Sequence, residues 1–456
     1  MKVRLLRPSL VLLGASLLAA PTVLAQEKAP PFARDGQPDP SFDVPPELNL
    51  QYALAFALDN NFAIRQAKER IRQQEGVVLE VKSARIPNVS STAGYERNAE
   101  EISTNGLDHS WAVNITATQV LFSGGGVSAG IKSQELAREA AILAMKAVVN
   151  DVLLAVRTQF YEVLVSRERI KVQEQSVELL QRQLQDVRNR FEAGTVSNFE
   201  VLRAEVALAN AQPPLISARN AYRLAIDDLR QLLGFVTVNE ANVSRLPEFL
   251  GTLEFAPVKA DLGSSLLAAR EQRPELQRLR LLEASAEETV KARRAGYFPT
   301  VSLFGAYDWR RAPASSTSSM RDGWSAGVQA QWDIFDGRAT AGRVIQARSL
   351  LEQTRLATAD FQLSIDVEVR RAVSSLQEAT ELAEASAKVV EQAEEALRLA
   401  NARFSAGTAT QLDVLTAQTD LTTARLNQLE ANYRFNVAVA ALRRATGQSD
   451  ELFGAL

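Results

Sequence analysis

The side chains that most often do chemistry in proteins are scarce or isolated in this sequence. It has no cysteine and one histidine, His109, so one chain cannot supply a metal site of thiolates or of paired imidazoles. Gly124–Gly126 lack the Lys-Ser/Thr pair of a phosphate loop, and no serine has the strand-turn-helix setting of a hydrolase nucleophile. The carboxylates Glu287–Glu288 and Glu394–Glu395 are typical of exposed helix faces. We expect no enzyme and no cofactor.

One motif stands out because it occurs twice at a constant spacing. The pattern Arg-Phe-x-Ala-Gly-Thr at Arg190–Thr195 recurs at Arg403–Thr408, an offset of 404 − 191 = 213 residues. The same offset relates Gly234 to Gly447. An offset that holds over so long a span indicates two copies of one structural unit.

The residue types of each copy predict a tight turn between two helices. Gly194 and Gly407 permit the backbone conformation that reverses the chain. A hydroxyl residue followed three positions later by an acid predicts a capping box at the start of each returning helix. These two predicted boxes are Ser197 with Glu200 and Thr410 with Asp413.

Composition and the first residues indicate an exported, folded protein. The chain has 456 residues, 46% hydrophobic and 23% charged, and its net charge of −3 gives no support for nucleic-acid binding. Residues 1–25 have the basic start, apolar stretch and small-residue end of a signal peptide, so the mature chain is expected to begin at Gln26. No later segment is apolar enough to be a membrane-spanning helix.

Hydrophobic periodicity places both turns between long helices. Residues 127–191 contain no proline, and no glycine after Gly130, which predicts a rod of roughly 100 Å. Its three-four spacing of apolar residues predicts one packed stripe, formed by Val149, Val152, Val156, Phe160 and Val163.

The predicted organisation starts with an irregular tail at 26–47. A first repeat follows at 48–234, with a β-hairpin at 89–122 and a turn at 193–197, and an equatorial connector at 235–263 leads to the second repeat. The second repeat covers 264–447, with a β-hairpin at 300–335 and a turn at 406–410, and a tail follows at 448–456.

All four tryptophans are predicted to lie in the two hairpins. Segments of about ten alternating residues with aromatic side chains are typical of strands that cross an outer membrane. A small soluble sheet with an aromatic core is the alternative. Four strands cannot close a barrel, so membrane strands would require several chains to share one. The expected interface aromatics are Trp111, Trp309, Trp324, Trp332 and Tyr307.

Together, the signal peptide, the paired hairpins and the twin turns resemble the TolC-like outer-membrane efflux family. Further points of resemblance are Tyr297-Phe298-Pro299 before a strand, Phe335-Asp336-Gly337 after one, and the proline pair in Gln212–Leu215, where a helix bend or interruption is expected. The resemblance implies a homotrimer in the outer membrane. Its twelve pooled strands would form one barrel, continued by an α-helical coiled-coil tunnel through the periplasm. The implied partners are a periplasmic adaptor and an inner-membrane pump of the RND or ABC type.

In such channels the turns are the periplasmic tips, where the entrance closes and the adaptor docks. The resemblance implies that Asp413 lines the closed entrance. In the familiar gate of this family, a second aspartate, a tyrosine and an arginine lock the entrance. This sequence has Thr416, Phe404 and Ala409 at those positions, so a tyrosine–arginine–aspartate lock is not supported. The gate residues are therefore expected to be Asp413, Thr416 and Phe404. The expected docking residues are Arg190, Gly194, Thr195, Ser197, Arg403, Gly407, Thr408 and Thr410.

Two other classes of protein remain as alternatives. A periplasmic coiled-coil scaffold or adaptor would bind partners without conducting, although adaptors usually carry one helical hairpin rather than two. A secreted hydrolase lacks a nucleophile and base. Within the duct class, drug efflux, metal export and protein secretion share this architecture, and the proline pair favours drugs or other small toxic molecules.

Overall fold

The computed structural model describes residues 47–97, 109–235, 248–311 and 321–448. The predicted signal peptide and most of the two predicted tails lie outside these ranges, as does part of the connector. The helices are α1 Leu50–Asn60, α2 Phe62–Lys82, α3 Gly126–Glu192, α4 Asn198–Leu233, α6 Leu262–Gln272, α7 Pro274–Arg294, α8 Ala339–Ser405 and α9 Gln411–Thr446. The strands are β1 Glu47–Leu48, β2 Asn88–Arg97, β3 His109–Ser123, β4 Glu248–Phe249, β5 Thr300–Arg311 and β6 Arg321–Gln331, and short 3₁₀ turns η1 Ser83–Arg85 and η3 Ala295–Tyr297 precede β2 and β5.

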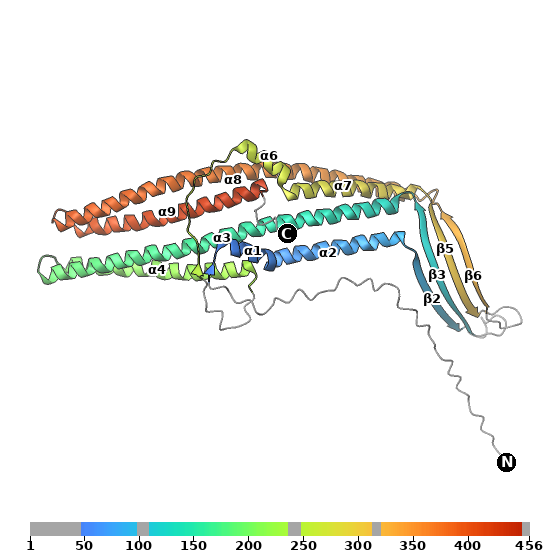
Figure 1. Cartoon of the computed structure of the whole chain (residues 1–456), viewed down its shortest axis with the longest axis horizontal. Coiled ribbons are helices and arrows are strands. Elements are labelled where there is room, and N and C mark those ends of the chain that lie inside the picture. Colours follow the sequence, from blue (N-terminus) through green and yellow to red (C-terminus); the bar gives the residue numbers. More distant parts are fainter. Residues whose placement is uncertain (1–46, 98–108, 236–247, 312–320, 449–456) are drawn as a thin grey trace, which may run out of the picture.

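The molecule is a long bundle with its sheet at one end and its two helical turns at the other (Figure 1). α3 and α8 have 67 residues each, which corresponds to about 100 Å of helix. α3 contacts α4 towards the turn and contacts α2 and α7 towards the sheet, while α8 contacts α9 and α7. No helix in the described ranges has both the length and the apolar character needed to span a bilayer.

The four long strands form one antiparallel sheet in the order β2-β3-β5-β6. β3 and β5 pair along their length and so join the first hairpin to the second. β2 and β6 are the edges, and each pairs with one strand in the described part of the chain.

The second hairpin is shorter than predicted. The sequence suggests a strand that reaches Phe335, but β6 ends at Gln331, whose partner is Thr300, the first residue of β5. Pro299 precedes that residue and has no N–H to continue the ladder. Trp332 therefore lies outside the strand, where its indole Nε1 donates a hydrogen bond to the carbonyl oxygen of Tyr297 at 3.2 Å.

The sequence suggests a bend or an interruption at the proline pair, and the interruption does not occur. α4 is continuous from residue 198 to residue 233, with Pro213 and Pro214 inside it. Both prolines are exposed, as are Ala209 and Asn210, whose carbonyl groups the prolines leave without a helical donor. Water can therefore satisfy these carbonyl groups, and the contacts of α4 with α3 hold the helix in place.

The first repeat contains the larger apolar core. Val149, Val152, Val156, Phe160 and Val163, predicted from their spacing to form one packed stripe of α3, are all buried. They contact buried side chains from α1 and α4 in a single cluster. This cluster fixes the middle of α3, from which both the sheet and the turns extend.

Candidate functional site at the helical turns and the sheet

Both helical turns have the backbone geometry that their shared motif predicts. Gly194 and Gly407 have φ of +73° and +74°, the left-handed region that favours glycine. The N–H of Thr195 donates to the carbonyl oxygen of Arg190 at 2.9 Å, and the N–H of Thr408 donates to its counterpart at 2.8 Å. The threonine hydroxyls donate to the same carbonyl oxygens, at 2.9 Å and 3.1 Å. The repeated residues thus close the ends of α3 and α8.

The caps of the returning helices differ between the two turns. Thr410 and Asp413 form the predicted capping box: the N–H of Asp413 donates to Thr410 Oγ1 at 3.3 Å, and the N–H of Thr410 donates to Asp413 Oδ2 at 2.7 Å. The box predicted for Ser197 and Glu200 is wrong, because the Ser197 side chain makes no capping hydrogen bond. Glu200 instead lies 3.7 Å from Arg203.

The two turns contact one another through side chains. The guanidinium carbon of Arg190 lies 4.6 Å from the ring centre of Phe404, a cation–π contact. Gln411 is only 3% exposed, and with its amide nitrogen facing α4 it donates to Glu200 Oε2 at 2.5 Å and to the Glu200 carbonyl oxygen at 3.2 Å. Leu179 of α3 packs on the apolar cluster between α8 and α9. The hairpin tips therefore form one joined unit within the chain.

Asp413 and Thr416 lie one helical turn apart on an exposed part of α9, while Val414 and Ala417 are buried. Hydrogen bonds from the backbone and hydroxyl of Thr410 hold the pKa of Asp413 below its usual range, and the positive charge of Arg403 acts in the same direction. The Asp413 carboxylate is therefore charged at neutral pH, and part of its hydrogen-bonding capacity serves the cap.

The sheet has one aromatic face and one polar face. The register pairs Tyr95 with Trp111, and Tyr307 with both Ile115 and Trp324, and paired residues share a face. Trp309 lies on that face too, with its ring centre 4.4 Å from that of Tyr307.

The polar face carries side-chain hydrogen bonds together with the ring of Phe304, whose partners in the register are Thr118 and Gly327. Asn114 Nδ2 donates to Asp308 Oδ1 at 2.5 Å, and Thr116 Oγ1 donates to Asn114 Oδ1 at 2.5 Å. Four of the five predicted interface aromatics, all except Trp332, thus lie in the strands on one face.

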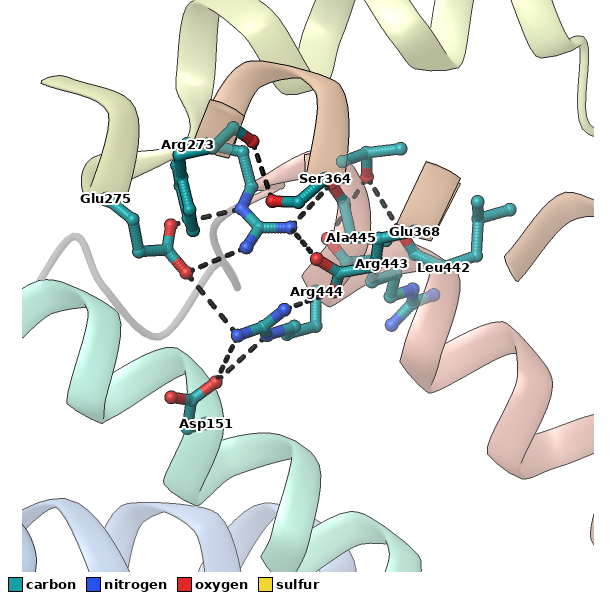
Figure 2. Close-up of polar contacts among 11 residues, drawn as sticks. Asp151, Arg273, Glu275, Ser364, Glu368, Leu442, Arg443, Arg444 and Ala445 are labelled. Carbon is teal, nitrogen blue, oxygen red and sulfur yellow. Dashed lines mark hydrogen bonds and ion pairs between the residues drawn. The ribbon is translucent and has the colours of Figure 1, made fainter. Parts of the chain in front are cut away.

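Sequence reasoning missed a buried arginine at the junction between α6 and α7 (Figure 2). Arg273 is 2% exposed and donates to both carboxylate oxygens of Glu275 at 3.0 Å and 2.9 Å. It also donates to Glu368 Oε2 at 2.8 Å and to the carbonyl oxygen of Ala445 at 3.3 Å. Glu275 is a near neighbour on α7, but Glu368 and Ala445 belong to α8 and α9, far away in the sequence.

A second arginine extends this network to the first repeat. Arg444 on α9 forms ion pairs with Glu275 at 3.4 Å, with Glu368, and with Asp151 of α3 at 2.8 Å. Burial tends to lower the pKa of Arg444, but the neighbouring carboxylates raise it overall, so the guanidinium remains charged. The network joins α3, α7, α8 and α9 at mid-length of the bundle.

Comparison with known proteins agrees with this geometry. The sequence profile described as outer membrane efflux protein matches residues 54–235 and 266–448. Among similar proteins, protein CyaE of Bordetella pertussis is 29% identical over 92% of this chain and 90% of its own length. The cobalt-zinc-cadmium resistance protein CzcC of Cupriavidus metallidurans is 26% identical over 88% of this chain and 90% of its own length.

Solved structures have the same fold. CusC superposes with a TM-score of 0.78 at 18% identity, covering 88% of this chain and 92% of that one. The Campylobacter jejuni CmeC outer membrane channel gives 0.76 at 14% identity, covering 89% of this chain and 88% of that one. The resemblance drawn from the turn motifs is confirmed, and the chain belongs to the outer membrane efflux protein family, whose function is that of an exit duct for efflux or secretion.

Proposed function

We propose that three copies of this chain form one exit channel in the outer membrane, each giving four strands to a shared barrel of twelve. The observation that carries the proposal is a four-stranded sheet with one aromatic face and edges at β2 and β6. An open edge cannot lie in lipid, and closed barrels begin at about eight strands. Three copies satisfy both conditions if β6 of each pairs with β2 of the next.

In this assembly the aromatic face meets lipid and the polar face lines the pore. Trp111, Tyr307, Trp309 and Trp324 belong to the aromatic face, and rings of this kind favour the membrane–water interface. We propose that Trp332, which follows β6 at the boundary between sheet and helices, lies at the inner interface. Asn114 and Asp308 face the water of the pore.

The helices continue the duct through the periplasm. α3 and α8 are each about 100 Å long, and both run from the sheet to the turns. The two repeats of each chain would supply alternating walls of the tunnel. The turns then lie at its inner end, where a periplasmic adaptor and an inner-membrane pump of the RND or ABC type deliver the cargo.

The adaptor is proposed to dock on the repeated turn residues. All of these residues except the half-buried Arg190 are exposed at the end of the two hairpins, and the Arg190–Phe404 contact holds the two turns in one arrangement. The proposed docking residues are Arg190, Gly194, Thr195, Ser197, Arg403, Gly407, Thr408 and Thr410.

We place the constriction at Asp413 and Thr416, beside Phe404. Three copies would bring three Asp413 carboxylates together, and a ring of this kind favours cations. Replacing Asp413 with asparagine should lower the cation preference of the trimer in planar bilayers and weaken block by divalent cations. Unchanged selectivity and unchanged block would exclude the carboxylate ring.

The cargo is proposed to be small toxic molecules such as drugs. The relatives' names point in several directions, from cobalt-zinc-cadmium resistance to alkaline protease secretion. Deletion of the chain should increase sensitivity to dyes, detergents and antibiotics. Unchanged sensitivity to all of these would remove the drug assignment while leaving the channel proposal intact.

A matched pair of strand variants decides between a channel and the alternative, a periplasmic scaffold. Ile115→Arg places a charge on the aromatic face, at a cost of about 2–4 kcal/mol at mid-membrane, whereas Thr116→Arg places it on the polar face. The first should abolish the heat-labile trimer in the outer-membrane fraction and the second should retain it. A wild-type chain recovered from the periplasmic fraction would support the scaffold instead.

A further inference from the structure

A groove crosses the middle of the bundle, where the two repeats meet. It has a volume of about 920 Å³, within the range of ligand-sized pockets, and its walls come from α1, α2, α3, α6 and α7. Its floor is apolar: Ile64 and Val149 are each 2% exposed, and Ile142 and Met145 extend the same surface along α3.

The rim of this groove carries more positive than negative charge. Lys68 of α2 and Lys146 of α3 are both exposed there, and among the described residues neither has an ion-pair partner. Among the described residues that line the groove, Glu271 of α6 is the one carboxylate. A peptide with acidic side chains next to apolar ones would match the groove in both respects.

The chain itself supplies such a peptide at the right place. α9 ends at Gly447, which lines the groove and has a φ of +72°. A Cβ on this glycine would meet the backbone of Gln272 and Arg273 at 2.9 Å, so the chain leaves α9 pressed against the groove's wall. The next residues, 449–456, read Ser-Asp-Glu-Leu-Phe-Gly-Ala-Leu, with two acids before two large apolar side chains.

The length of this segment also fits. The α3 side of the groove runs from Ile142 to Asn150, about 12 Å of helix at 1.5 Å per residue. Eight residues reach up to about 29 Å when extended. We propose that residues 449–456 bind in this groove of their own chain, with Asp450 and Glu451 near Lys68 and Lys146 and with Leu452 and Phe453 on the apolar floor. The segment would thereby fasten the second repeat across α3 of the first.

The absence of cysteine makes disulfide trapping a clean test in the full-length protein. Met145→Cys combined with Phe453→Cys should form an intrachain disulfide under mild oxidation, seen as a mobility shift on a non-reducing gel. The matched control joins Phe453→Cys to Lys171→Cys, an exposed site on α3 about 30 Å beyond Asn150, whereas Phe453 reaches about 18 Å from Gln448. The control pair should stay unlinked.

Equal linking of the two pairs would overturn the proposal, and so would disulfides that form only between chains, because the occupant would then be a second copy's tail.

The charge match is tested in the same background. Lys68→Glu with Lys146→Glu should slow the groove disulfide about tenfold, since ion pairing of a few charges changes occupancy on that scale, and Asp450→Lys with Glu451→Lys should restore it. An unchanged rate in the first double variant would rule out recognition through charge.

Discussion

Each repeat has a junction where two short helices meet the end of the returning helix: α1 and α2 meet α4 in the first repeat, and α6 and α7 meet α9 in the second. The two junctions have the same backbone arrangement, but one is built on a neutral side chain and the other on a charged one. Each returning helix ends at a glycine with positive φ, Gly234 at +77° and Gly447 at +72°. Each glycine packs against the kink between two short helices, and a Cβ would meet Asn60 O at 2.5 Å in the first repeat and Arg273 N at 2.9 Å in the second.

Even the hydrogen bonds across the two junctions correspond. Asn61 Nδ2 donates to the carbonyl oxygen of Leu232 at 2.6 Å, and Arg273 Nη1 donates to that of Ala445 at 3.3 Å. The two acceptors differ by 445 − 232 = 213 residues, the offset of the repeat. The same backbone carbonyl is therefore satisfied in both repeats, by a neutral amide in one and by a charged guanidinium in the other.

The surroundings of the two donors differ just as much. Asn61 adjoins the large apolar cluster of the first repeat, whereas Arg273 lies among Glu275, Glu368 and Arg444 beside a smaller cluster. The charged junction forms an ion pair with the other repeat, between Arg444 and Asp151. The comparison indicates that the duplicated architecture is set by backbone positions, and that the charged copy couples the two repeats.

The largest expected difference between the two repeats is in the stability lost when the junction side chain is removed. Arg273→Ala removes the buried partner of Glu275 and Glu368 and leaves both carboxylates paired only with Arg444, which should cost about 3 kcal/mol, the lower end for a broken buried ion pair. Asn61→Ala removes a helix cap and one hydrogen bond, at about 1–2 kcal/mol. The midpoint of thermal unfolding of each purified variant should fall further for Arg273→Ala.

A variant that removes Arg273 and its two carboxylate partners together distinguishes lost pairing from lost packing. Arg273→Met combined with Glu275→Gln and Glu368→Gln should recover most of the loss, because the remaining charge at the junction, Arg444, keeps its ion pair with Asp151. If Asn61→Ala proved as damaging as Arg273→Ala, the contrast between the two junctions would fail.

A second prediction compares a junction glycine with a turn glycine. Both Gly234→Ala and Gly194→Ala place a Cβ on a residue with positive φ, which costs about 1–2 kcal/mol. Gly234→Ala adds a clash with the carbonyl oxygen of Asn60, whereas nothing lies within 4 Å of the new atom at Gly194. Denaturant unfolding should therefore show the larger loss for Gly234→Ala, and equal losses would contradict the close packing at the junction.

The caps of the two returning helices should differ by a smaller amount. Thr410→Ala breaks a complete capping box and should cost about 1 kcal/mol, while Ser197→Ala removes no capping hydrogen bond and should cost close to nothing. Amide hydrogen exchange over the first turn of α9 and of α4 measures each effect locally. A comparable rise in exchange at both sites would contradict the asymmetry.

The smallest expected effect is the response of the Thr410–Asp413 cap to pH. Because the pKa of Asp413 is lowered in the folded chain, its contribution is fully present above the ordinary aspartate value of about 3.9 and is lost as the pH falls through the lowered value. The protection factor at the start of α9, which is the exchange rate of the unfolded chain divided by that of the folded chain at the same pH, should stay constant down to about pH 4 and then fall. Loss of protection already between pH 6 and about pH 5 would be inconsistent with the box.

Local patterns in the sequence were enough to predict the turns and the packed stripe of α3. The Ala-Gly-Thr steps determine the reversals at Gly194 and Gly407 through bonds within six residues, and the spacing from Val149 to Val163 reflects one helix face. The predicted cap at Ser197 did not form: the N–H of Glu200 donates to the carbonyl oxygen of Ser197, not to its side chain. Glu200 also contacts Gln411 of the other hairpin, a neighbour that no local pattern predicts.

The contacts of Arg273 were equally out of reach of sequence reasoning. Its partner Glu368 lies 95 residues away, and no periodicity relates a junction residue to a position on another helix. The strand end at Gln331 was missed for a related reason, since it depends on where Pro299 stops the neighbouring strand.

The central claim, that three copies form one open duct, is tested most directly by single-channel recording of the purified full-length protein in planar lipid bilayers. The account predicts discrete, long-lived conductance steps from the trimeric fraction, which vanish when heating dissociates the trimer. Folded trimers that insert into the bilayer and yet give no conductance steps would contradict it.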